Sequence, residues 1–158
     1  MDMTWLIPAE QWGEHALVAL VAFAATAIAV TIHYEGLHRL AEHYSGRAPT
    51  RSRRVMLRIM FALIALHIIE IWVFGLAYWG LLHIDGTGFV HGTHGLENLF
   101  DAIYLSATTY TTLGFGDLAP VGAIRLVAGM EALTGFLLVT WSASFTYLEM
   151  SRYWRRDV

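Results

Sequence analysis

The stretch from residue 111 to residue 117 combines residue types that can bind a cation without any charged side chain. It is polar and rich in glycine, yet it lies between two long apolar segments. Non-helical backbone is tolerated at membrane depth only where it is buried in protein or lines a water-filled cavity. Gly114 and Gly116 lack a Cβ and can adopt dihedral angles closed to other residues, so successive carbonyl groups can point the same way. The candidate ligands for a monovalent cation are five consecutive residues, Thr112, Leu113, Gly114, Phe115 and Gly116.

Positions 112–117 read Thr-Leu-Gly-Phe-Gly-Asp. This run resembles the selectivity-filter signature of potassium channels, whose usual form is Thr-Val-Gly-Tyr-Gly-Asp. Residues 104–110 precede it as a pore helix should, and residues 55–150 resemble the two-helix pore module of the potassium channel pore-loop superfamily. The resemblance implies passive, potassium-selective conduction. It also implies a homotetramer, since one pore loop cannot enclose a pathway and a ring of carbonyl groups needs several copies around an axis.

Two other functions stay open. A weakly selective monovalent cation channel would share the architecture, although such relatives tend to disturb the Gly-Phe-Gly core that is intact at positions 114–116. A membrane-embedded metal- or haem-binding protein would use His33, Glu35, His38 and His43, which could ligate iron, zinc or haem near one membrane face. A five-residue spacing does not align ligands on one helical face as i, i+4 does. An interfacial helix with polar residues toward the headgroups explains the same pattern.

The composition points to a membrane protein. The chain has 158 residues, about one domain, and 56% of them are hydrophobic. Its mean hydropathy of +0.50 leaves too little polar surface for a soluble domain. There is no cysteine, which excludes disulfides, thiolate nucleophiles and thiolate metal sites. We expect no enzymatic activity, no resident cofactor other than permeant K⁺ ions, and no nucleic-acid partner.

Three apolar runs must position the filter within a lipid bilayer, because about 20 apolar residues cross its hydrocarbon core. Residues 99–110 are too few to span and should form a re-entrant pore helix. The sequence therefore predicts an all-α integral membrane protein with three transmembrane helices per subunit. The expected segments are an exterior N-terminal segment (1–14), a peripheral transmembrane helix (15–37), a cytoplasmic basic loop (38–54), an outer pore-module helix (55–82), an exterior turret (83–98), a pore helix (99–110), the filter (111–117), an inner pore-lining helix (121–150) and a cytoplasmic tail (151–158).

Two clusters of arginine, within residues 39–54 and 152–156, set the expected orientation. Positive charge marks the cytoplasmic side of a membrane protein. We therefore expect an exterior N-terminus and a cytoplasmic C-terminus in a plasma or inner cell membrane. The arginines flank the helices instead of recurring at every third position inside one, so the sequence does not predict strong voltage gating.

Two glutamates lie at similar inferred depth in the second and third apolar runs. Intramembrane carboxylates usually face protein or water because lipid exposure is costly. We expect Glu131 to support the filter from behind by bonding the hydroxyl of Thr108 or Thr109. A protonated, satisfied glutamate at a helix interface is the alternative. Glu70, with His67 one turn away, has no assigned role.

Gly135 lies in the middle of the third apolar run, where glycine costs about 1 kcal/mol relative to alanine. In the potassium channel resemblance, this position matches a hinge glycine of the inner helix only if the loop after Pro120 is one residue shorter than usual. Close helix packing by a small residue explains it equally well.

Three histidines of the expected turret, His83, His91 and His94, precede the pore helix. Histidine changes charge near neutral pH. In a tetramer these groups would surround the outer mouth, near Asp117, which we expect to help support the filter. Protonation there would oppose cation entry. Ordinary solvated residues in a glycine-rich loop are the alternative.

Overall fold

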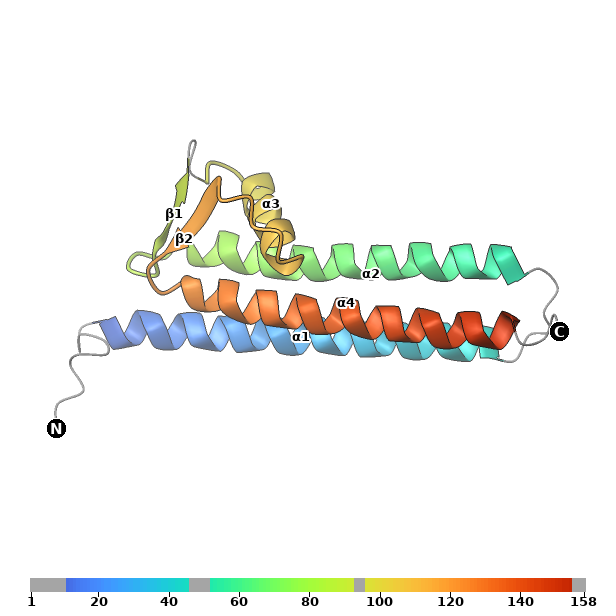
Figure 1. The fold of residues 1–158 in the computed structure, drawn as a ribbon. Coiled ribbons are helices and arrows are strands. Elements are labelled where there is room, and N and C mark those ends of the chain that lie inside the picture. The colour runs from blue at the N-terminus through green and yellow to red at the C-terminus, as the bar shows by residue number, and fades with distance from the viewer. Residues whose placement is uncertain (1–10, 46–51, 93–95, 155–158) are drawn as a thin grey trace.

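The structure, a computed structural model of the chain, describes residues 11–45, 52–92 and 96–154 (Figure 1). In chain order their elements are α1 (Trp12–Ser45), α2 (Ser52–Leu81), β1 (Phe89–Gly92), α3 (Leu99–Tyr110), β2 (Leu118–Val121) and α4 (Arg125–Trp154). Most of the expected exterior N-terminal segment, the centre of the basic loop and the end of the tail lie outside the described residues.

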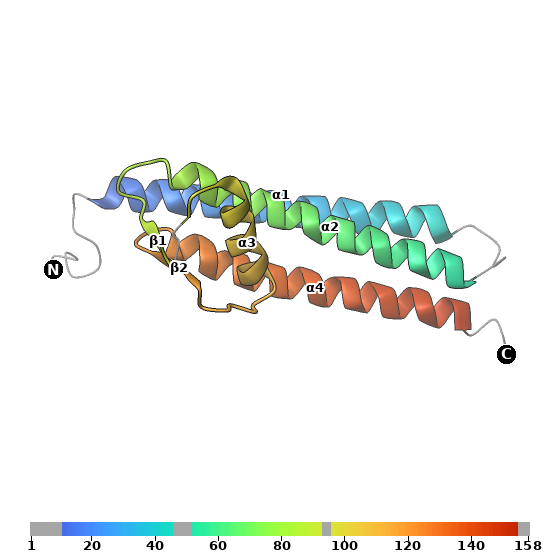
Figure 2. The same cartoon turned by 90° about the horizontal axis from the view of Figure 1, so that it is seen from above.

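The three long helices α1, α2 and α4 run side by side (Figures 1 and 2). Each contains a stretch long and apolar enough to cross a membrane, at Trp12–Tyr44, Arg53–Leu81 and Arg125–Ser151. Apolar side chains that would be unfavourable in water can face lipid along such helices. The all-α membrane class predicted from the sequence is therefore confirmed.

Helix α1 is longer at its C-terminal end than expected, reaching Ser45 instead of residue 37. The added turns are polar but remain helical, because charged side chains four residues apart face each other on a helix surface. Arg39 Nε donates to Glu35 Oε1 at 2.8 Å, and His38 Nε2 lies 3.4 Å from Glu42 Oε1. A helix can therefore continue past the point where its apolar run stops.

Helix α3 is short and packs against α2 and α4. It starts at a capping box: Asn98 Oδ1 accepts hydrogen bonds from the backbone N–H groups of Phe100 and Asp101, while Asp101 Oδ2 accepts from the backbone N–H of Asn98. It ends at Tyr110, and two residues later Thr112 adopts a positive φ that a helix cannot accommodate. The helix covers the same residues as the expected pore helix.

A two-stranded antiparallel sheet joins the turret to the segment after the filter, and the sequence analysis did not predict it. Phe89 in β1 pairs with Val121 in β2, and Gly92 pairs with Leu118. The inner helix consequently begins at Arg125 and not at the expected residue 121. Gly88 allows this close pairing, since a Cβ there would lie 2.2 Å from the Val121 carbonyl oxygen.

The main core lies between α1 and the other helices at the end of the bundle that carries the sheet. On α1 its buried residues are small and recur every three or four positions, at Val18, Ala22, Ala25 and Ala29. Small side chains at that spacing let helix backbones approach closely within a membrane. The first helix is thereby packed firmly against the elements that hold α3.

Candidate functional site

The backbone from residue 112 to residue 116 alternates in handedness. Thr112, Gly114 and Gly116 have positive φ values of 58°, 51° and 82°. Among the described residues Thr112 is the one non-glycine residue with positive φ, so Leu113 and Phe115 between them keep negative values. Alternation of this kind lets successive carbonyl groups face the same side of the chain. These φ values agree with the alternation expected from the sequence.

Thr112 is an outlier, because a β-branched residue rarely adopts a left-handed conformation. Such strain persists only where the surrounding structure enforces it, and it gathers at functional sites. Here the end of α3 provides the restraint. The Thr112 N–H donates to the Thr109 carbonyl at 2.9 Å, and the Leu113 and Gly114 N–H groups donate to the Thr108 carbonyl at 2.9 and 3.1 Å. The end of α3 therefore directly holds the first residues of the candidate filter.

A side-chain hydrogen bond holds the other end of the candidate filter, at Asp117. Tyr104, in the first half of α3, donates its hydroxyl proton to Asp117 Oδ2 at 2.8 Å. The bond to the Asp117 carboxylate raises the pKa of the Tyr104 hydroxyl above its usual value. The sequence analysis named Asp117 as filter support but missed Tyr104. A tyrosine in the first half of a short helix, followed by a loop that returns alongside that helix, was the available signal for this contact.

Glu131 supports α3, but through partners other than those expected. Its carboxylate accepts hydrogen bonds from the Ser106 hydroxyl and, at 2.8 Å, from the Tyr78 hydroxyl. The expected partner Thr108 instead bonds its own helix, donating to the Leu105 carbonyl at 3.0 Å. Ser106 lies on the side of α3 that faces α4, so the rotation of the helix decides the partner. Glu131 is completely buried and ties α2, α3 and α4 together.

Gly135 lies against the C-terminal end of α3. A Cβ added at this position would be 2.1 Å from the Tyr110 carbonyl oxygen, far inside van der Waals contact. Helix α4 runs through the position without interruption. Of the two interpretations of this glycine, the contact favours close packing of the inner helix against the pore helix.

The filter faces away from the rest of its own chain. Leu113 and Phe115 are 59% and 66% exposed. Apart from the adjacent residues, no atom of the described part of the chain lies within 4 Å of the place where a Cβ of Gly114 or Gly116 would stand. A single chain therefore presents the candidate ligands on an open surface and does not enclose them.

The sequence profile of a family described as ion channel matches residues 61–148, more than half of the chain. The chain belongs to this ion channel family. The match takes in most of α2, all of α3, the filter and most of α4, whereas α1 lies outside it. Together with the three membrane-capable helices, it places this channel in a membrane and points to a transport protein and not an enzyme.

Two curated proteins resemble parts of the channel. Protein LctB of Geobacillus stearothermophilus is 37% identical over 57 residues, which are 36% of this chain and 42% of that protein. Protein LctB of Bacillus caldotenax is 42% identical over 43 residues, or 27% and 32% of the two chains. The channel thus spans less than half the length of the curated relatives it matches. No solved structure matches it.

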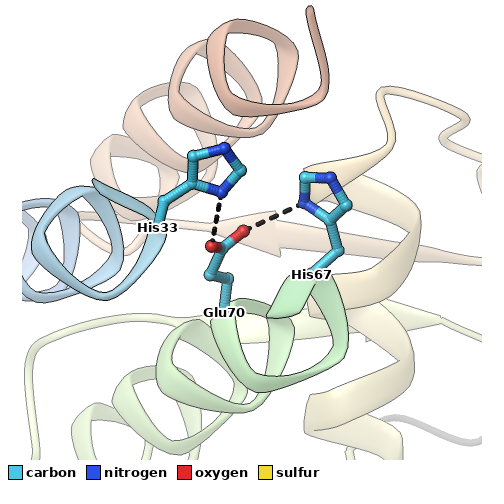
Figure 3. A group of neighbouring side chains, drawn as sticks. All are labelled: His33, His67 and Glu70. Atoms are coloured by element: carbon cyan, nitrogen blue, oxygen red, sulfur yellow. Dashed lines mark hydrogen bonds and ion pairs between the residues drawn. The ribbon is translucent and has the colours of Figure 1, made fainter. Parts of the chain in front are cut away.

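A second polar cluster connects the first helix of the channel to the end of the pore helix (Figure 3). His33 Nδ1 on α1 lies 2.8 Å from Glu70 Oε1 on α2, and His67 Nδ1 lies 3.0 Å from Glu70 Oε2. Tyr110, the last residue of α3, donates its hydroxyl proton to Glu70 and lies 2.9 Å from His67 Nδ1. His33 and Glu70 are completely buried. The sequence analysis noted the pair His67 and Glu70 but did not connect either residue to His33.

Among the described residues, the structure does not bring together the alternative metal set of α1, which is His33, Glu35, His38 and His43. Glu35 bonds Arg39 and His38 pairs with Glu42, both on exposed turns of the same helix. Glu35, His38 and His43 follow His33 by two, five and ten residues, and such offsets place side chains on different sides of a helix. His33 is the buried member of the set, and its partners come from α2 and α4.

The turret histidines of the channel lie apart along the chain. His83 follows α2, is exposed, and has Nδ1 2.6 Å from the Trp79 carbonyl oxygen. His91 is an exposed residue of β1, in register with Ala119. His94 lies outside the described residues.

Proposed function

We propose that this ion channel is potassium-selective and conducts K⁺ passively, down its electrochemical gradient. The observation that carries the proposal is the alternation of positive φ at Thr112, Gly114 and Gly116 within the sequence Thr-Leu-Gly-Phe-Gly-Asp. Carbonyl oxygens aligned by that alternation can replace the hydration shell of a monovalent cation. Hydrogen bonds at both ends of the loop support a fixed filter: the Thr108 carbonyl accepts from the Leu113 and Gly114 N–H groups, and the Tyr104 hydroxyl donates to Asp117.

The proposed assembly is a homotetramer around the filter. Leu113 and Phe115 of the loop, and Phe136 of α4, are exposed apolar side chains in the single chain and would be available for contacts between copies. Four copies around one axis would convert the single open loop into a ring of carbonyl groups and would enclose the pathway. The N-terminus would be exterior and the C-terminus cytoplasmic, since arginine gathers at the α1–α2 junction and beyond α4.

Reversal potentials test the selectivity. Purified channel is placed in a planar bilayer with potassium on one side and sodium on the other. We expect a reversal potential displaced strongly toward the potassium equilibrium potential. A value near zero would instead favour a weakly selective cation channel.

A matched pair of glycine substitutions tests the filter itself. Gly116→Ala places a Cβ on a residue whose φ is 82°, a conformation that alanine rarely adopts, so selectivity or flux should be lost. Gly80→Ala is the control, because Gly80 is helical and has no described atom near its Cβ position. Its reversal potential should equal that of the parent. Unchanged selectivity in Gly116→Ala would remove this loop as the filter.

A further inference from the structure

Three side chains that commonly bind metal ions converge where α1, α2 and the end of α3 meet. They are His33, His67 and Glu70, and their ligand atoms all lie within 4.8 Å of one another (Figure 3). Two histidines and one carboxylate are a ligand set used by zinc and by other first-row transition metals. His67 and Glu70 are one turn apart on α2, and helix packing adds His33 of α1 from 37 residues away.

The distances within the cluster suit one shared ion. Metal–nitrogen and metal–oxygen bonds of about 2.0 to 2.2 Å place neighbouring ligand atoms about 3 to 3.5 Å apart. The two histidine nitrogens lie 2.8 and 3.0 Å from the carboxylate oxygens that face them. The ring centroids of His33 and His67 are 5.3 Å apart, and two imidazoles on one tetrahedral ion would have centres about 5 Å apart. Shifts of a few tenths of an ångström would therefore admit an ion.

Two hydroxyl groups beside the cluster add hydrogen-bonding partners to the three candidate ligands. A metal-binding histidine usually hydrogen-bonds through its second ring nitrogen, which fixes the orientation of the ring. Nε2 of His33 lies 3.4 Å from the Ser142 hydroxyl on α4, on the side of the ring away from Glu70. The Tyr110 hydroxyl, 2.9 Å from His67 Nδ1, supplies a fourth polar group beside the three ligands. Glu70 provides the negative charge that a buried dication needs.

We propose that His33, His67 and Glu70 bind a first-row transition-metal dication, with Zn²⁺ the ion to test. Two nitrogen ligands disfavour Mg²⁺ and Ca²⁺, which prefer oxygen. The ion would cross-link α1 to the outer pore-module helix and, beside Tyr110, would lie next to the end of the pore helix. Tyr110 contacts Gly135 through its carbonyl and immediately precedes the candidate filter, residues 111–117. Metal binding between α1 and α2 would thus act on the end of α3, which holds the proposed filter.

Direct binding measurements test the site in the purified full-length channel. Equilibrium dialysis measures Zn²⁺ bound per chain in the presence of excess Mg²⁺, and Co²⁺ absorption reports the ligand geometry. We expect one Zn²⁺ per chain and a visible spectrum typical of four-coordinate Co²⁺. Absence of Zn²⁺ binding by the parent protein would overturn the proposal and leave the cluster as a hydrogen-bonded network alone.

Variants locate the binding. His33→Gln and His67→Gln should each weaken Zn²⁺ binding about ten-fold or more, since each removes a ligand. His67 is partly exposed, so its replacement tests the site even where His33→Gln does not fold. His38→Gln is the control: this histidine lies on α1 but is half-exposed and paired with Glu42. Equal loss in the control, or no loss in the ligand variants, would assign the bound metal to surface histidines and overturn the site.

The proposal of a metal site is independent of potassium selectivity, because dialysis measures binding without conduction. Only the effect of Zn²⁺ on current rests on the proposed function. In bilayers, Zn²⁺ should change the current of the parent and of His38→Gln, and should leave that of His67→Gln unchanged. Zn²⁺ binding by a protein that shows no potassium selectivity would keep the site and remove the proposed potassium function alone.

Discussion

The Tyr104 hydroxyl in the first half of α3 donates a hydrogen bond of 2.8 Å to Asp117, the last residue of the proposed filter. The two residues are 13 positions apart, and the residues between them form the rest of α3 and the whole filter. The bond therefore closes a loop whose inner corner is already held by the Thr108 carbonyl. A short loop fixed at both ends keeps the spacing of its carbonyl groups, which would coordinate the ions if the loop acts as the proposed filter.

Replacement of Tyr104 tests this bond. Tyr104→Phe keeps the ring and removes only the hydroxyl, so we expect a tetramer that assembles normally but discriminates less between potassium and sodium. Reversal potentials and single-channel open times are the measurements. Tyr147→Phe, at a highly exposed tyrosine of α4, is the control. Identical selectivity and open times in Tyr104→Phe and the parent would show that the bond has no role in conduction.

The buried carboxylate of Glu131 should contribute to stability. Glu131→Ala leaves the buried hydroxyl of Tyr78 without its acceptor, and an unsatisfied buried group costs about 1–3 kcal/mol. We expect a clear fall in the midpoint of thermal unfolding in detergent. Glu35→Ala removes an exposed ion pair with Arg39 and should cost about 1 kcal/mol or less. A variant at Glu131 as stable as the one at Glu35 would contradict the supporting role.

Two substitutions in α4 can distinguish a packing role of Gly135 from a hinge role. Gly135→Ala forces a methyl group against the Tyr110 carbonyl, and such overpacking costs about 1–3 kcal/mol. Gly129→Ala, on the same helix with no described atom within 4 Å, should be neutral or stabilising. Thermal unfolding of both variants decides the matter. Equal stability of the two, accompanied by a changed open probability in Gly135→Ala, would favour the hinge.

External acid should inhibit the current if the turret histidines surround the outer mouth. Protonation of His83, His91 and His94 in four subunits would add positive charge that opposes cation entry. Single-channel recordings at exterior pH of about 8 and about 5.5 compare the parent with a triple His→Gln variant. Equal acid responses in the two proteins would exclude these histidines, and an unresponsive parent would end the hypothesis.

Voltage dependence should be weak. Moving one charge through the field contributes about 2.3 kcal/mol per 100 mV, so steep gating needs several arginines inside the membrane. In the described part of the chain, the arginines of α2 and α4 with defined side chains lie near helix ends, at Arg53, Arg54, Arg58 and Arg125. Current–voltage curves in symmetric potassium should therefore be nearly linear. A steep activation curve would contradict this prediction.

The sequence by itself determined the membrane class, the family and the range of α3. These depend on local properties: the length of an apolar run, a glycine every second residue, and a helix too short to span. The limits of α1 and α4 were less well predicted. Polar side-chain pairs extend α1, and strand β2 delays the start of α4. Neither effect changes the hydrophobic pattern from which the helix limits were predicted.

The tertiary structure alone decided which polar residues meet. Glu131 bonds Ser106 and not Thr108, Asp117 bonds Tyr104, and His33 bonds Glu70 across 37 residues. Each of these contacts depends on how far one helix is rotated and shifted against another. A rotation of 100° per residue moves a neighbouring side chain to another face, so the depth of a residue in the membrane can be inferred from sequence while its partner cannot.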